Sequence, residues 1–148
     1  RMTSAKNERT AVSGTIIGGL AYFCFAFVPI FLAYAALVAD PALKVNAALT
    51  TSASRHSADM AERDYFDHNS LDGRSPFDRM KAAGYSYSRA AENIAAGQPT
   101  AAAVVAGWMK SAGHRANIVN CDLTEIGVGV AKGGRYGIYW TQNFGTPR

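Results

Sequence analysis

The sequence predicts an α+β fold, and three observations support that fold class. Three segments with helix signatures come first, two strand-like segments of alternating apolar residues come last, and a glycine pair joins the two strands. A chain of 148 residues is long enough for one domain with its own core and too short for two. We therefore expect one domain whose helices precede a β-hairpin.

An N-terminal apolar helix is expected to precede this domain. Residues 14–39 carry no charge and are about long enough to cross a bilayer. The arm before them is basic, so the positive-inside rule predicts that the chain after Asp40 is exported. The apolar segment can be a signal peptide cleaved near 33–35, an uncleaved membrane anchor or a buried core helix. The expected division is a basic arm with signal peptide or anchor over 1–39, and a folded domain over 40–148.

The charge of the chain argues against a nucleic-acid-binding protein, and its cysteine content argues against a domain stabilised by disulfide bonds. The net charge is +4, and the N-terminal arm supplies half of it. In the rest of the chain, basic residues alternate with acids and form no dense stripe, so we expect no nucleic-acid partner. Cys24 lies in the apolar segment and Cys121 in the exported part, so the two cannot pair within one domain. We expect Cys121 to be buried as a small apolar side chain.

The first helix of the domain is expected over residues 46–63. No Gly or Pro interrupts this segment, and Asn46 can act as the N-cap. His56 precedes Asp59 by three residues here, a spacing typical of a local hydrogen bond on a solvated face. The segment DYFDHNSLDG is dense in Asp, Asn, Ser and Gly, which predicts a loop carrying His68.

The second helix has a compact signature in RSPFDRMKAAG. Ser75 can cap this helix and Pro76 suits its first position. Asp78 complements the helix dipole, and Gly84 ends the helix. The following segment, YSYSRAAENIAAGQP, indicates a polar connection that carries Glu92.

The third helix is expected to begin at Thr100 and to turn Trp108 towards the core. It is expected to end at Gly113, which leaves His114 just past its C-terminus. In EIGVGVA, alternating apolar residues then indicate a half-buried strand, and RYGIYWTQNF alternates again. The pair at 133–134 suits a tight hairpin turn, and we expect the aromatic residues after it to lie in the core.

Two histidines are candidates for a functional site because both follow loop signals. If the fold brings His68 and His114 together, their imidazoles can bind a divalent metal or transfer a proton. A structural role is the alternative, since a histidine past a helix C-terminus is favoured there as a cation. Glu92 can be an acid in the same cleft or a loop charge.

The motifs in their order resemble the bacterial branch of the CAP superfamily, also called SCP-like domains. The resemblance runs from about Leu43 to Phe144, through HSADMAERDYFDH, SPFDRMKAAGYSYS, AENIAAG, GWMKSAGHRANIVN, TEIGVGVA and YWTQNFG. It implies an α-β-α sandwich in which a central antiparallel sheet lies between helical layers. Where relatives have a first helix, this chain has the apolar stretch PIFLAYAALVAD, which either replaces that helix or packs onto the domain.

The resemblance also implies a cleft lined by two histidines and two glutamates. Carried onto this chain, these positions are His68, Glu92 and His114, whereas Ser111 stands where many relatives have the second glutamate. Two imidazoles and one acid still suit one divalent cation, with zinc as the expected ion and His68 and His114 as its ligands. Ser111 makes two-carboxylate acid–base chemistry a poorer fit.

The family is credited with lipid or sterol binding, cation binding, cell-wall roles and proteolysis, so the resemblance leaves several functions open. We predict an exported or membrane-tethered binding module for an extracellular small-molecule, lipid or cell-envelope ligand. If residues 14–39 remain uncleaved, the membrane is a further partner. The alternatives are a metal-dependent hydrolase, such as a peptidase with Glu92 as its general base, and a purely structural envelope protein.

Overall fold

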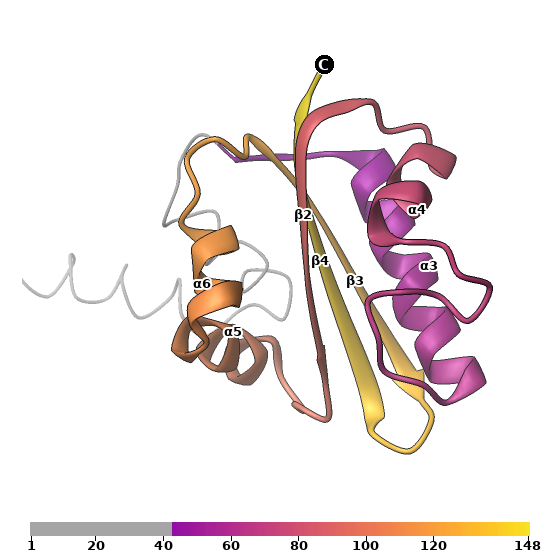
Figure 1. Cartoon of the computed structure of the whole chain (residues 1–148). Helices are drawn as coiled ribbons and strands as arrows, with labels where there is room; N and C mark the ends of the chain where they lie inside the picture. The colour runs from indigo at the N-terminus through magenta and orange to yellow at the C-terminus, as the bar shows by residue number, and fades with distance from the viewer. Residues whose placement is uncertain (1–42) are drawn as a thin grey trace, which may run out of the picture. The chain divides into compact units, whose positions relative to one another are not determined.

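The structure is a computed structural model that describes residues 43–148. Two helices cover each face of one sheet, with α3 and α4 on one side and α5 and α6 on the other (Figure 1). The elements are β1 (Lys44–Val45), α3 (Ala47–Arg63), α4 (Pro76–Ala82), β2 (Tyr87–Ala96), α5 (Ala101–Lys110), α6 (Ala112–Ile118), β3 (Glu125–Gly133) and β4 (Gly137–Pro147). The α-β-α sandwich is therefore confirmed. The expected apolar N-terminal helix lies outside the described residues.

The sheet has the strand order β1-β3-β4-β2. β3 and β4 form an antiparallel hairpin, and β2 pairs antiparallel with the other side of β4. The three long strands thus make the expected antiparallel sheet. The two-residue β1 pairs with β3 in parallel, so the complete sheet is mixed. β2 lies at one edge of the sheet, a position that matters for the site.

Local cap signals set the helix starts as predicted. The Asn46 side chain accepts hydrogen bonds from two amides in the first turn of α3. Ser75 and Asp78 form a reciprocal capping box at the start of α4. The Gly133-Gly134 pair takes positive φ angles at the β3–β4 turn, as the hairpin prediction requires.

Two glycines let α3 lie directly against β3. A Cβ atom at Gly127 would lie 2.1 Å from the backbone nitrogen of Thr50, and one at Gly129 would lie 2.3 Å from the carbonyl carbon of Ala53. The alternate residue Ile126 faces the other way and joins the core beneath α5 and α6. The first half of β3 is therefore covered on both faces, whereas the sequence predicted a half-buried strand.

Two expectations about secondary structure were wrong. The polar connection around Glu92 is the strand β2, whose small and polar residues give little strand signal but pair with β4 along nine positions. The helix from Thr100 ends at Lys110, and Ser111 separates it from α6, which contains both Gly113 and His114. His114 therefore lies on a helix instead of beyond one.

Two expectations about burial were also wrong. His56 is 1% exposed, and its Nε2 lies 3.0 Å from the carbonyl oxygen of Asp67 instead of bonding Asp59. The sequence could not reveal this because α3 is covered by the following loop as well as by the sheet. Cys121 is exposed, and its loop leaves the thiol outside the core. Tyr139 and Phe144 are core residues as expected, but Tyr136 is 46% exposed.

None of the helices within 43–148 has both the length and the hydropathy needed to cross a bilayer. The apolar run at 14–39, on which the signal-peptide and anchor interpretations depend, lies outside this range.

Candidate functional site

Glu92 lies on the edge strand β2, on the face covered by α3 and α4. Its side chain is only 2% exposed, and each carboxylate oxygen has a partner. Oε1 lies 2.9 Å from Nδ1 of His68, and Oε2 accepts a hydrogen bond of 2.7 Å from Nη2 of Arg79. A carboxylate this deeply buried needs such partners to remain charged. Arg79 supplies the compensating charge.

Arg79 also fixes the loop that carries His68. Its Nη1 donates to the carbonyl oxygen of His68 at 2.7 Å and to that of Arg74 at 3.2 Å, while the side chain is 6% exposed. This residue was not among the sequence candidates. The sequence RSPFDRMKAAG has no signal that distinguishes a buried arginine from a solvated one. The only hint is that Arg79 stands next to the apolar Met80, which is buried in the structure.

Asn143 completes the surroundings of Glu92 from the neighbouring strand β4. In the amide orientation that satisfies both of its polar groups, its nitrogen donates to Glu92 Oε2 at 3.0 Å and its oxygen accepts from Ser52 Oγ at 3.2 Å. Glu92 is thereby held between α3, α4 and β4. Its carboxylate can orient His68 but is enclosed by protein.

His114 reaches the site from the opposite face of the sheet. Its Nδ1 lies 2.8 Å from Oγ of Ser111, and its carbonyl oxygen accepts from Nδ2 of Asn93 at 3.2 Å. Asn93 in turn accepts a 2.8 Å hydrogen bond from the amide of Asn117 on α6. Asn93 is fully buried, which makes it the anchor of α6 on β2.

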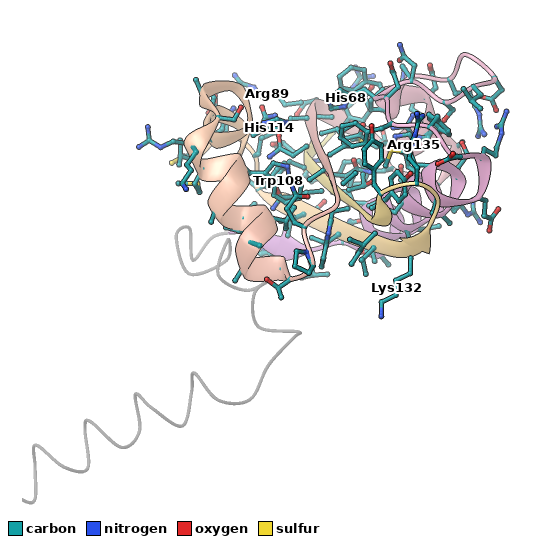
Figure 2. All side chains as sticks on the ribbon, turned by 90° about the horizontal axis from the view of Figure 1, so that it is seen from below. His68, Arg89, Trp108, His114, Lys132 and Arg135 are labelled. Carbon is teal, nitrogen blue, oxygen red and sulfur yellow. The ribbon has the colours of Figure 1, made fainter. Side chains whose placement is uncertain are left out.

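The site therefore straddles the edge of the sheet. Glu92 and Asn93 are neighbours in β2, so their side chains point to opposite faces. One holds the His68 loop and the other holds the helix of His114, and Figure 2 shows the two histidines on the same edge of the domain. The four predicted cleft residues thus form two bonded pairs, His68 with Glu92 and Ser111 with His114.

The electrostatics favour a neutral imidazole at His114. Burial lowers the pKa of this histidine from its ordinary value near 6.5, and the positive charge that His68 can carry lowers it further. By contrast, the His68 side chain is 48% exposed, so the cleft has one open and one sheltered histidine.

The hydrogen bonds fix which ring nitrogen of His68 is free and leave two possibilities for His114. Because the Glu92 carboxylate can only accept, Nδ1 of His68 carries the proton and Nε2 keeps its lone pair. Ser111 can donate or accept, so His114 has two possible tautomers. When Nδ1 donates to Ser111, Nε2 of His114 also keeps its lone pair. In this tautomer each histidine has an unprotonated Nε2, the kind of ring nitrogen that can bind a cation.

A cavity of about 260 Å³ opens beside His114. Its apolar walls include Phe66 from the His68 loop and Trp108 from α5, and its polar wall includes Ser111 and His114. Phe66 was not predicted from the sequence, although it comes two residues before His68. The cavity suits a small ligand with an apolar part, placed within reach of the imidazole of His114.

The metal-ligating residues of the site are few. Within residues 43–148, no group of three or more His, Cys, Asp or Glu side chains is arranged to hold a metal ion. The two predicted ligands, His68 and His114, are thus not joined by a third metal-ligating side chain in this part of the chain, and Glu92 lies behind His68 as its hydrogen-bond partner. A cation here would need water or a ligand to complete its coordination.

Comparison with known proteins gives the family and the fold. Residues 36–144 match CAP, the cysteine-rich secretory protein family. The chain is 49% identical over 102 residues to the uncharacterized protein YkwD of Bacillus subtilis (strain 168), with 69% of this chain and 38% of that protein covered. An extracellular protein containing a SCP domain from Bacillus anthracis str. Ames has a TM-score of 0.65 at 35% identity, over 70% of this chain and 33% of the other.

A more distant structure has a similar fold at nearly full coverage. An outer surface protein from Borrelia burgdorferi has a TM-score of 0.71 at 22% identity, over 80% of this chain and 91% of the other. By contrast, the chain spans well under half the length of YkwD and of the Bacillus anthracis protein. The family match covers most of the chain and includes every cleft residue. The chain therefore belongs to the CAP, or cysteine-rich secretory protein, family.

Proposed function

We propose that this chain is an extracytoplasmic CAP-domain binding module whose cleft takes one divalent cation and a small, partly apolar ligand. The observation that carries the proposal is the paired orientation of the two histidines. Each has its Nδ1 atom in a hydrogen bond, to Glu92 in one case and to Ser111 in the other. A metal-binding histidine is ordinarily oriented by such a bond from its second nitrogen.

The extracytoplasmic location rests on the relatives and on the N-terminal sequence. The Bacillus anthracis relative is named as an extracellular protein, and the Borrelia burgdorferi protein as an outer surface protein. In this chain a basic arm precedes the uncharged residues 14–39, an order that directs the following domain out of the cytoplasm. The mass of the mature protein distinguishes cleavage of this segment from its retention as an anchor.

Zinc is the cation that we expect, because imidazole nitrogen is among its preferred ligands. Structural zinc sites have four protein ligands and catalytic sites usually three, whereas His68 and His114 supply two. Binding should therefore be weaker than in a structural zinc site, and water or a bound ligand should complete the shell. A reversible cation site fits a binding module.

Glu92 is better suited to orient His68 than to act as the base of a hydrolase. A general base must reach the proton that it removes. Both oxygens of Glu92 are already bonded, one to His68 and one to Arg79, and the side chain is 2% exposed. A peptidase mechanism with Glu92 as base would have to break a buried ion pair in every cycle. We therefore rank binding above peptidase activity.

A zinc titration of the full chain tests the proposal. We expect binding of one zinc ion per chain by isothermal titration calorimetry, and loss of that binding in the His68→Ala, His114→Ala double variant. Cys121 is exposed and can bind zinc through its thiol, so every titration should use a Cys121→Ser background. Absence of zinc binding in that background, or equal binding by the double variant, would remove the cation from the proposal.

A turnover assay separates the binding module from the peptidase. Incubation of the full chain with a broad peptide panel, with and without zinc, should leave the peptides intact. Cleavage that depends on zinc and is lost in the Glu92→Gln variant would reverse our ranking.

A further inference from the structure

The Ser111 side chain forms an unusual bond for a residue in its position. Ser111 follows the last residue of α5 and is the N-cap residue of α6, with φ −96° and ψ 122°. A serine at an N-cap ordinarily accepts a hydrogen bond from an amide in the first helical turn. Here the side chain makes no such bond, and its Oγ lies 2.8 Å from Nδ1 of His114. The hydroxyl is directed at an imidazole instead of at the helix.

A hydroxyl in hydrogen-bond contact with an imidazole nitrogen is the basic unit of an activated nucleophile. Ser111 is the N-cap residue of α6 and His114 lies three residues later in its first turn, so this one short helix keeps the two side chains together. Both residues line the cavity of about 260 Å³, so a bound molecule can reach the hydroxyl. The thiol of Cys121, another nucleophilic side chain of the domain, lies exposed in a loop beyond α6.

The cavity indicates what such a nucleophile would attack. Its walls beside Ser111 include Phe66, Ile94 and Trp108, which suit an apolar group. The volume is somewhat below the roughly 300–1,000 Å³ of pockets for drug-sized ligands, so the group must be short. An ester with a short, apolar acyl chain fits these limits.

We propose that Ser111 and His114 form a nucleophile–base pair that hydrolyses esters with short apolar acyl groups. Ser111 Oγ bonds to the carbonyl carbon while its proton passes to Nδ1 of His114. The ester C–O bond then breaks, and the departing alkoxide takes that proton and leaves as the alcohol. Water attacks the acyl-serine with His114 as base, which releases the carboxylic acid and restores Ser111. The balance is ester plus water to acid plus alcohol.

This activity goes beyond the proposed binding function and uses the other tautomer of His114. When Ser111 donates its proton to Nδ1, Nε2 of His114 carries the hydrogen and has no lone pair for a cation. Ester hydrolysis therefore belongs to the metal-free cleft. An assay in the presence of a chelator tests the nucleophile alone, so its result is independent of whether zinc binds.

Within residues 43–148, the only side chain bonded to the His114 imidazole is Ser111 itself, so no acid orients this histidine. We therefore expect the pair to be weak and to hydrolyse only reactive esters. In serine proteases, loss of the orienting acid lowers the rate by about 10⁴. A dyad of this kind should acylate with activated esters and phosphonates, and should leave amides intact.

The test is covalent labelling of the full chain by a fluorophosphonate probe in the presence of EDTA. We expect one adduct by intact-mass spectrometry, mapped to Ser111, formed as the P–F bond breaks and fluoride leaves. Ser111→Ala should abolish the adduct, and His114→Ala should slow its formation at least tenfold. Ser88→Ala is the matched control, since Ser88 is exposed and its hydroxyl bonds only backbone carbonyl oxygens.

A second readout uses p-nitrophenyl butyrate under the same conditions, with release of nitrophenolate lost in Ser111→Ala and retained in Ser88→Ala. Circular dichroism of each variant shows whether it is folded. The proposal is overturned if the folded native chain takes no adduct at Ser111, or if His114→Ala is labelled as fast as the native chain.

Discussion

The ion pair between Arg79 and Glu92 lies deep enough that one partner cannot be removed alone. Breaking a buried pair typically costs about 3–5 kcal/mol because an uncompensated charge remains. Arg79→Met would leave the Glu92 carboxylate, 2% exposed, beside His68 without its cation. We expect this variant to lower the free energy of unfolding by about 3 kcal/mol in urea denaturation. Adding Glu92→Gln should recover part of the loss.

Arg74→Met is the control for this pair. Arg74 bonds Asp72 through an ion pair in which both side chains are about half exposed, so its loss should change the urea midpoint little. Comparable losses in the two single variants would contradict the role given to Arg79.

His56 gives a second prediction at the residue scale. Burial lowers the pKa of His56 to about 4 in the folded chain, compared with 6.5 for a free imidazole. Between pH 4 and pH 6.5, the unfolded chain binds a proton at His56 more readily than the folded chain does. The contribution of His56 to stability is therefore complete above pH 6.5 and is lost as the pH falls towards 4. The shift corresponds to about 3 kcal/mol over that range.

The measurement is urea unfolding at pH 7, 5 and 4, compared between the native chain and His56→Gln. The variant keeps a donor for the Asp67 carbonyl but does not titrate, and its stability should fall less with pH. Carboxylates titrate in both proteins and cancel in the comparison. If the free energy of unfolding falls equally with pH in the two proteins, His56 is not the cause of the fall.

At the scale of elements, the close contact of α3 with β3 depends on glycine. Overpacking typically costs about 1–3 kcal/mol, and contact with backbone leaves little room for adjustment. We expect Gly127→Ala to lower the free energy of unfolding by about 3 kcal/mol in the same denaturation assay, because its Cβ would lie 2.1 Å from the nitrogen of Thr50.

Gly107→Ala is the matched substitution on the other helical layer. Gly107 lies inside α5 with nothing within 4 Å of an added Cβ atom. Alanine is the better helix former by about 0.5–1 kcal/mol, so this variant should be slightly more stable than the native chain. A loss at Gly107 as large as that at Gly127 would rule out close packing as the reason.

The elements also show why some features could be predicted from sequence and others not. Asn46 and Ser75 were identified as caps because each bonds amides within three residues of itself. β2 was missed because its partner strand lies about fifty residues further along, and its own residues carry little strand signal. The break at Ser111 was missed because neither Gly nor Pro marks it.

At the scale of the whole molecule, the order of short motifs predicted the layers better than periodicity did. The resemblance placed His68, Glu92 and His114 in one cleft, and the structure brings them to one sheet edge. It did not reveal Arg79 or Asn93, which hold the site from within the core. Their burial depends on contacts between elements distant in sequence, which no local pattern records.

The position of the cleft on an edge strand has a consequence for how the domain must assemble. β2 is joined to the sheet on one side only, through its pairing with β4. A slip of one residue in that register would turn Glu92 towards α6 and Asn93 towards α3. Both histidine supports would then be lost in one step. The correct register of β2 on β4 is thus required both for the His68–Glu92 half of the site and for the Asn93–His114 half.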